Sequence, residues 1–206
     1  MKKFFLVLSF VLLVGAGCSS FTPTPGLENN KPPVVVPPEP TRQYVSEPTK
    51  EWTYTLHYPN TFTYLHNVDI QNLEGTGTYK GDSIVFSNEL FDRSISDVRM
   101  NLTSDEGVCA STGEKVVFNG VNFIMKKVSD AGAGNQYTTE SYYTQKGTTC
   151  YRIDLFEHTT TPENYASNEE EAKQFRVEHD ATLVKIHQEF EKIMQTFQFS
   201  ELPVAT

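Results

Sequence analysis

Prolines are crowded into one stretch of this chain. Eight of its eleven prolines lie between Ser19 and Lys50, at positions 23, 25, 32, 33, 37, 38, 40 and 48. A proline fixes its own φ angle and has no backbone N–H, so such a stretch cannot form a helix or a central β-strand. We therefore predict an extended, semi-rigid and disordered tether of about 3.1 Å per residue, on the order of 100 Å at most. It serves as a plain spacer or as a Pro-rich motif for a groove-binding partner, and composition favours the spacer.

Residues 1–17, ahead of the tether, have the layout of a secretory signal peptide. Lys2 and Lys3 precede an apolar run over residues 4–14, and small residues follow as far as Cys18. The apolar run is shorter than the about 20 residues that a membrane-spanning helix needs. The small residues before Cys18 resemble the bacterial lipobox, in which a lipid is attached to the cysteine and cleavage makes it the new N-terminus.

The lipobox resemblance implies where the protein works. It implies a lipidated Cys18 at the start of segment 18–50, with membrane lipid as a partner and an exported domain anchored to the cell membrane or the outer membrane. Two or more acyl chains give stable anchoring, whereas one chain is marginal. Cleavage by the ordinary signal peptidase within residues 15–17 is the alternative, since that enzyme also favours small residues.

The remaining 156 residues, 51–206, suit one globular domain. A domain of that size buries roughly 70% of its unfolded surface, which is enough for a core without a metal. The whole chain carries a net charge of −9, and since Lys2 and Lys3 leave with the signal peptide and the tether is neutral, the domain carries −11. Nucleic acids and anionic membrane surfaces both require a basic footprint, so neither is expected as a partner.

The first two thirds of the domain have the composition and alternation of β-strands. The clearest strands are predicted at residues 52–58, 114–118, 121–128, 136–145 and 149–157. Asn119-Gly120 connects two of them and favours a tight hairpin, because a type I′ turn needs positive φ twice. About six or seven strands with short connections predict a largely antiparallel, twisted sheet.

The last third of the domain changes to a helical period. Within residues 168–196 apolar side chains recur at three- and four-residue spacings, which marks one face of an amphipathic helix. Ser167 with Glu170 fits a capping box at its start. The apolar face weakens at residues 178–182, so one bent helix and two helices are both open. With residues 197–199 as a short final strand, this order predicts an α+β fold in which the helix packs on one face of the sheet.

Two segments of the domain resemble the PsbP-like lipoproteins. One is Trp52–Tyr64, in which a Tyr-Pro pair lies between two aromatic strands, and the other is Ile193–Phe199, an Ile-x-x-x-Phe-x-Phe ending. Residues 131–137 and 150–153 are similar to those of uncharacterised bacterial lipoproteins of the same general shape. The resemblance covers most of residues 52–199 and implies an α/β/α or α+β fold. It brings no catalytic residue to this chain.

Two cysteines are left in the domain once Cys18 carries a lipid. Cys109 and Cys150 are an even number in an oxidising compartment, which favours a disulfide. It would close a loop of about 40 residues, worth roughly 3–4 kcal/mol. Two free buried thiols are one alternative. A catalytic Cys150 activated by His158 is another, although eight residues along a strand span about 26 Å.

Other candidate chemistry is sparse. The sequence contains no cofactor fingerprint, nucleophile elbow or EF-hand loop, so we expect no cofactor and no metal. His187 and Glu191 are one helical turn apart and could share a ligand, but such a pair is usually a solvated helix face. The Ala-Gly-Ala-Gly run at 131–134 resembles a phosphate-binding loop, yet without a following Lys-Ser/Thr we expect a hairpin connection there.

Aromatic residues are concentrated on two adjacent predicted strands. On the first of them, Tyr137 and Tyr143 share one face of the strand and Tyr142 points to the other. An exposed aromatic row would bind a glycan or a protein. Buried rings would instead fill the core between the sheet and the helix.

Two functions from different classes are consistent with these patterns. The absence of a nucleophile or metal motif favours a binding or envelope-assembly module, held off the membrane by the Pro-rich tether. The alternative is a lipid-anchored hydrolase that acts on an envelope component. A concave pocket with several polar side chains of perturbed pKa would favour the enzyme.

Overall fold

The computed structural model describes residues 40–48, 52–71, 73 and 77–202. The predicted signal peptide at 1–17, the lipidation site Cys18 and most of the predicted tether lie outside the described residues. The described residues belong to the folded domain.

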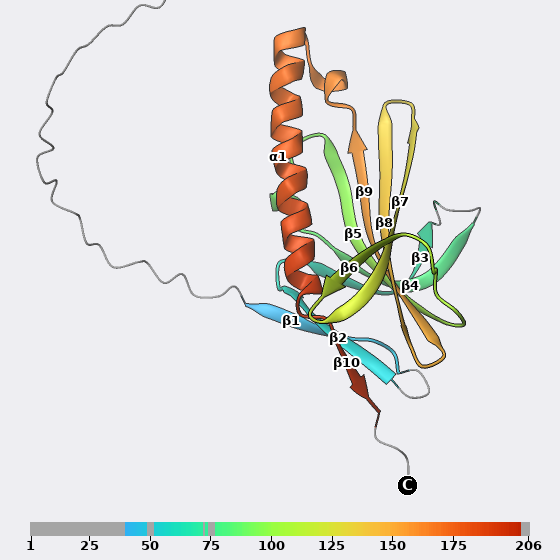
Figure 1. Ribbon diagram of the computed structural model, residues 1–206. Coiled ribbons are helices and arrows are strands. Elements are labelled where there is room, and N and C mark those ends of the chain that lie inside the picture. The colour runs from blue at the N-terminus through green and yellow to red at the C-terminus, as the bar shows by residue number, and fades with distance from the viewer. Residues whose placement is uncertain (1–39, 49–51, 72, 74–76, 203–206) are drawn as a thin grey trace, which may run out of the picture. The chain divides into compact units, whose positions relative to one another are not determined.

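A seven-stranded antiparallel sheet forms the centre of the domain (Figure 1). Its spatial order is β3-β4-β5-β9-β8-β7-β6, with the consecutive strands β6 to β9 running as a meander. The strands are β3 (Thr63–Gln71), β4 (Thr78–Val85), β5 (Ile95–Glu106), β6 (Glu114–Phe118), β7 (Val121–Gly132), β8 (Asn135–Lys146) and β9 (Thr149–Thr160). Every pair is antiparallel, as the short connections predict.

Tight turns with positive φ produce this meander. Asn119 and Gly120 have φ values of 46° and 77° between β6 and β7, as a type I′ hairpin requires. Ala133 and Gly134, at 52° and 79°, turn the chain in the same way between β7 and β8. The Ala-Gly-Ala-Gly run is therefore a hairpin connection.

A second sheet of three antiparallel strands has the order β1-β2-β10. It consists of β1 (Thr41–Val45), β2 (Trp52–Pro59) and β10 (Gln198–Glu201). The tether predicted over 18–50 is wrong for residues 40–48, because β1 lies within it. Between Pro40 and Pro48 the chain has no proline, and a strand at the edge of a sheet tolerates prolines beside it. Tyr44 of this strand is buried, so the folded domain starts earlier than expected.

One long helix, α1 (Glu169–Met194), follows the strands, so the prediction of a single helix holds and the two-helix alternative does not. Its N-cap is Asn168, whose side chain accepts from the Glu171 backbone N–H. The Ser167 backbone N–H donates back to the Glu171 carboxylate, so the capping contacts start one residue later than the predicted pair. Two short 3₁₀ helices, η1 (Asn88–Leu90) and η2 (Pro162–Tyr165), lie in the connections.

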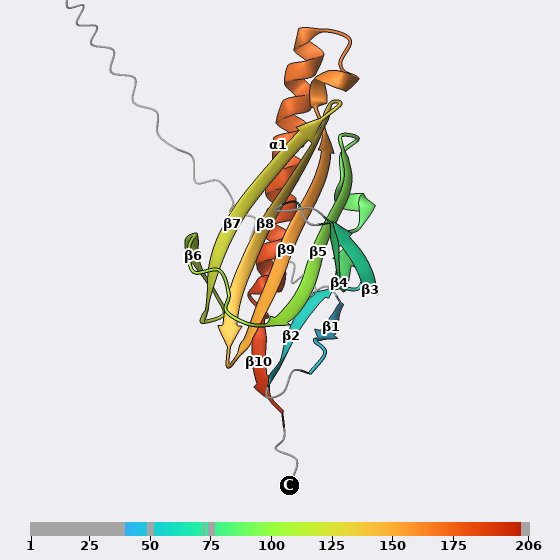
Figure 2. The same cartoon turned by 90° about the vertical axis from the view of Figure 1, so that its right-hand side faces the viewer.

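The core lies between one face of the large sheet and a second layer made by α1 and the small sheet. Figure 2 looks onto the opposite face of the large sheet, with α1 behind it. Tyr54 of β2 stacks on Phe197 with ring centroids 4.8 Å apart, and Tyr142 of β8 lies 5.0 Å from Phe190 of α1. The fold is therefore α+β, with the helix packed on one face of the sheet as predicted.

A disulfide joins Cys109 to Cys150, as predicted, with the two Cα atoms 5.0 Å apart. It fixes the β5–β6 connection to the start of β9. Both sulfurs are consumed by this bond, which excludes the free thiols and the catalytic Cys150 that the sequence left open.

Candidate functional site

The face of the large sheet that α1 does not cover carries polar side chains; we call it the open face. Along β9 the core residues Ile153 and Leu155 alternate with Arg152 and Asp154, which point to the open face. Asp154 is 1% exposed although no helix covers it. Another part of the chain must therefore lie over this face.

That covering element is the distal half of the β3–β4 hairpin, residues 68–71 and 78–81, which we call the arm. β4 pairs with β5 only from Asp82 to Val85, so the arm is free to leave the sheet. A register shift in β3 between Leu65 and Val68 bends the hairpin, and Asn67 has a φ of 51° there. In Figure 1 the arm lies on the side of the sheet opposite α1.

Gly81 allows the arm to cross close to the sheet. A Cβ atom at this position would lie 2.6 Å from Thr103 Cγ2 and 2.8 Å from the Leu102 carbonyl oxygen. Real Cβ atoms do not approach so closely, so a side chain here would push the arm away from β5.

Asp154 fastens the arm to the middle of the open face. Its Oδ2 accepts a 2.6 Å hydrogen bond from the Tyr79 hydroxyl, and its Oδ1 accepts from Arg152 Nε at 2.7 Å. Burial and the Asp154 carboxylate raise the pKa of Tyr79 well above its ordinary value. Burial alone would lower the pKa of Arg152, but Asp154 outweighs it and raises that pKa. The guanidinium stays charged and the phenol stays neutral, which holds this contact together.

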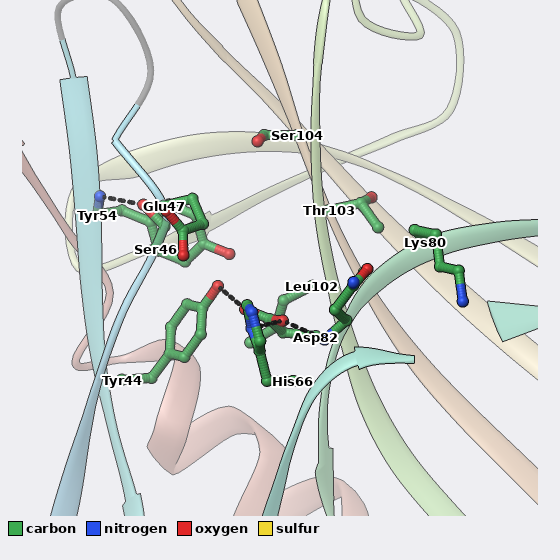
Figure 3. Close-up of a pocket in the computed structure, with 12 residues that line it drawn as sticks. Tyr44, Ser46, Glu47, Tyr54, His66, Lys80, Asp82, Leu102, Thr103 and Ser104 are labelled. Atoms are coloured by element: carbon green, nitrogen blue, oxygen red, sulfur yellow. Dashed lines mark hydrogen bonds and ion pairs between the residues drawn. The ribbon is translucent and has the colours of Figure 1, made fainter. Parts of the chain in front are cut away.

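Asp82 fastens the base of the arm (Figure 3). Its carboxylate accepts from the hydroxyls of Tyr44 and Tyr64, both at 3.0 Å, and from the Asn67 backbone N–H at 3.0 Å. His66 Nδ1 lies 2.9 Å from its Oδ1. Burial works to raise the pKa of Asp82, but these donors lower it below its ordinary value. A carboxylate with four partners has little capacity left for a ligand. A cavity of about 190 Å³ lies beside it, and His66 is among its lining residues.

A larger cavity of about 390 Å³ lies between the arm and the open face, and we call it the cleft. The arm contributes residues 69–71, and the sheet contributes Asp97, Arg99, Asn101, Tyr137, Phe156 and His158. Its volume falls within the range of about 300–1,000 Å³ that is typical of small-ligand sites. The cleft is therefore a candidate ligand-binding site.

Aromatic and polar groups of the cleft hold each other in place. The Tyr137 ring stacks on His158 with centroids 4.4 Å apart and planes 18° apart. His158 Nε2 lies 3.1 Å from the Asn135 side-chain oxygen, which can accept a hydrogen bond from it. Arg99 and Asp97 form a two-point ion pair with distances of 2.6 and 2.9 Å. The cleft is preorganised, which lowers the entropy cost of binding.

The structure separates the three tyrosines that the sequence singled out. Tyr137 lines the cleft. Tyr143 lies on the same face but beside Arg152, whose guanidinium carbon is 5.6 Å from its ring centroid. Tyr142 lies on the other face, is 6% exposed and donates to Glu140 Oε2 at 2.8 Å, so it fills the core.

Sequence reasoning missed the polar residues of the cleft, although a signal for them existed. Asp97, Arg99 and Asn101 occupy every second position of β5, between the core residues of 98–102. Alternation assigns them to the opposite face. The arm above them has no such signal, because its course depends on contacts between residues far apart in the sequence.

Two buried glutamates lie under α1 rather than at the cleft. Glu140 accepts from Lys127 Nζ at 2.8 Å in addition to Tyr142, and Glu157 lies beside it on β9. His187 of α1 faces both carboxylates. The solvated helix face expected for His187 with Glu191 is thus wrong for His187, which packs toward the sheet, whereas Glu191 is exposed as expected.

One serine, aspartate and histidine lie close together without forming a catalytic triad. Ser94 Oγ, Asp92 and His179 are close together, but Ser94 Oγ and Asp92 Oδ2 both approach the same ring nitrogen, Nδ1, at 2.7 and 3.7 Å. A triad needs them on different nitrogens. Within the described ranges, no three His, Cys, Asp or Glu side chains are arranged to hold a metal ion.

In the part of the chain that is described, no helix has both the length and the apolar character to cross a membrane.

Comparison with known proteins adds little to this geometry. The sequence matches no family model and no curated protein. A crystal structure from Bacteroides thetaiotaomicron is similar to this chain with a TM-score of 0.35 and 12% identity, over 70% of this chain and 44% of that protein. The chain thus spans less than half the length of the structure that it matches.

Proposed function

We propose that the protein is an exported lipoprotein whose folded domain is a binding module, with the cleft under the arm as its ligand site. One observation carries the binding role: a preorganised cavity of about 390 Å³ on the open face, with aromatic and polar side chains that the core does not use. The lining is stable without a ligand, because Asp154 and Asp82 hold the arm from both ends.

The envelope location rests on the sequence. The signal-peptide layout of residues 1–17, the lipobox-like residues before Cys18 and the prolines that follow support a lipid anchor and a spacer. The disulfide is consistent with an oxidising compartment. The PsbP-like assignment belongs to the same proposal and is supported by the helix that runs into Ile193–Phe199.

Retention on envelope fractions tests the binding role. The full chain is incubated with isolated cell wall and with membranes from a strain that lacks the protein, and the retained fraction is measured. We expect Tyr137→Ala to lower retention and Tyr165→Ala to leave it unchanged, since Tyr165 is exposed away from the cleft. Equal retention of both variants and the parent would contradict the proposal.

The anchor is tested separately by intact mass. The exported protein should have lost residues 1–17 and carry acyl chains on Cys18, and Cys18→Ser should abolish both changes. An unmodified Cys18 thiol in the exported chain would refute the lipoprotein assignment while leaving the cleft untouched.

A lipid-anchored hydrolase is the second candidate, and one arrangement favours it. Asp82 orients His66 through Nδ1, which directs Nε2 of a side chain that is 59% exposed toward other partners. Such a carboxylate–imidazole pair is the general-base half of a hydrolytic site. Loss of a hydrolytic activity on envelope material in His66→Ala, with its fold intact, would support this candidate over the binding module.

A further inference from the structure

We infer that the cleft recognises an uncharged sugar ring, so that the ligand of the binding module is a neutral glycan; this inference rests on the proposed function. The reasons are the charge balance of the cleft, its combination of flat rings with planar polar groups, and its place on the sheet.

The charges that line the cleft are matched by opposite charges. Arg99 is paired with Asp97, and Asp69 of the arm is paired with Lys80 at 2.8 Å. A phosphate or carboxylate ligand needs positive charge that is not already engaged. The acidic net charge of the whole chain, −9, adds a further barrier to an anion. An uncharged ligand fits this balance.

The polar groups of the cleft offer donors and acceptors side by side. The Asn101 side-chain oxygen accepts from Ser83 Oγ at 2.8 Å, so its NH₂ group is the part that can donate to a ligand. The Asp97 carboxylate is an acceptor, and the Arg99 guanidinium is a donor. Sugar hydroxyls donate and accept at once, so they can use both kinds of group.

Aromatic rings supply the apolar part of the contact. Tyr137 and Phe156 both line the cleft, and His158 holds the Tyr137 ring from one side. A pyranose ring presents C–H groups on its faces, which pack against a flat aromatic ring while its hydroxyls point outward to planar polar side chains. A lipid chain would cover these polar side chains and exclude water from them without offering a hydrogen bond in return.

The place of the cleft argues against an added peptide strand. Strand addition requires the free edge of a sheet. At the cleft residues Arg99 and Asn101, β5 is paired with β4 on one side and with β9 on the other, and β8 and β9 each have a neighbour on both sides. A peptide could not pair its backbone there, whereas a ring-shaped ligand needs no open edge.

Titration of the full chain in detergent with two soluble probes tests the inference. The neutral probe is chitotetraose and the acidic probe is tetragalacturonate, and binding is measured by calorimetry. We expect chitotetraose to bind and tetragalacturonate not to bind. Tyr137→Ala should weaken chitotetraose at least about tenfold, and Gln71→Ala, an exposed change on the arm, about two- to fivefold. Tyr165→Ala is the matched control and should bind like the parent.

Each other result has a defined meaning. Tighter binding of the acidic probe, or chitotetraose binding that neither Tyr137→Ala nor Gln71→Ala weakens, overturns the inference. If neither probe binds while retention on envelope fractions still depends on Tyr137, the neutral-glycan inference fails and the binding module stands. If that retention is also independent of Tyr137, the proposed function fails as well. Because Gln71 is exposed, its variant tests the cleft even if Tyr137→Ala proves unstable.

Discussion

His187 Nε2 of α1 lies 3.1 Å from Glu157 Oε1 of β9, and this ion pair joins the helix to the centre of the sheet. The Glu157 side chain is 6% exposed and that of His187 is 33% exposed. The other ring nitrogen of His187, Nδ1, lies 3.9 Å from Oε2 of Glu140. Glu140 in turn is contacted by Lys127 and Tyr142. A buried carboxylate is costly without a positive partner, so this polar contact between α1 and the sheet depends on the charge of the imidazole.

Stability should therefore fall as the pH rises. The contact with Glu157 raises the pKa of His187 above its ordinary 6.5, against the effect of burial. A raised pKa means that the stabilisation is complete below the unfolded-state value and is lost as the pH rises through the folded-state value. We expect the free energy of unfolding, measured in urea from pH 5.5 upward, to decrease above neutrality. The decrease should be smaller in His187→Gln, and identical profiles for the two proteins would contradict this role.

Removing the imidazole should also cost stability at a fixed pH. His187→Ala leaves Glu157 without its cation and should cost about 2 kcal/mol at pH 6, less than the 3–5 kcal/mol of a fully buried pair because the imidazole is one-third exposed. Glu157→Gln should recover part of this loss when added to His187→Ala. A double variant as unstable as the sum of its parts would show that the two side chains do not interact.

Asp154 should be the most sensitive side chain of the open face. Asp154→Ala leaves the Arg152 charge and the Tyr79 hydroxyl without their shared partner, and we expect a loss of about 3–4 kcal/mol. Tyr79→Phe removes only the hydroxyl and should cost about 1–2 kcal/mol. Hydrogen exchange should quicken in the arm of Tyr79→Phe but not in Tyr165→Phe, the control.

Gly81→Ala should displace the arm. Its methyl group would meet Thr103 and the Leu102 carbonyl oxygen, at an expected cost of about 1–3 kcal/mol. Gly132→Ala is the matched control, because a Cβ at Gly132 meets nothing within 4 Å. If thermal melting shows that both variants match the parent, the close crossing at Gly81 does not hold the arm.

The disulfide should contribute about 4 kcal/mol. Cys109 and Cys150 are 41 residues apart, and a crosslink over that length restricts the unfolded chain by about this amount. Urea unfolding of the Cys109→Ser, Cys150→Ser double variant measures the loss. Alkylation of the unfolded parent without reductant provides the check, since a reactive thiol at either position would disprove the bond.

Much of the fold could be predicted from sequence because its signals are local. The turn at Asn119-Gly120, the alternation of β9 and the period of α1 each lie within a few residues of the element that they define. The strand β1 was missed because surrounding prolines dominate the composition there, while its stability comes from pairing with β2. Local residue preferences can be read from the sequence, but the pairing of a strand with a segment elsewhere in the chain cannot.

The site was less predictable for the same reason. Tyr137 was found as an aromatic on a strand, but the cleft around it depends on an arm held by Tyr79 to Asp154, 75 residues apart, and by Tyr44 to Asp82, 38 residues apart. No periodicity links such pairs. The conformation of Asn67 and the close crossing at Gly81 become meaningful only once the arm is seen.

The position of Tyr44 gives the domain a mechanical property. Tension on the chain ahead of Thr41 enters the domain through β1, which is held by five residue pairs with β2 and by the Tyr44 hydroxyl on Asp82. If a pull separates β1 from β2, Asp82 loses a hydrogen-bond donor at the base of the arm, and the arm over the cleft is held less firmly. A strand that composition alone assigns to the spacer would then transmit force from the proposed anchor to the proposed ligand site.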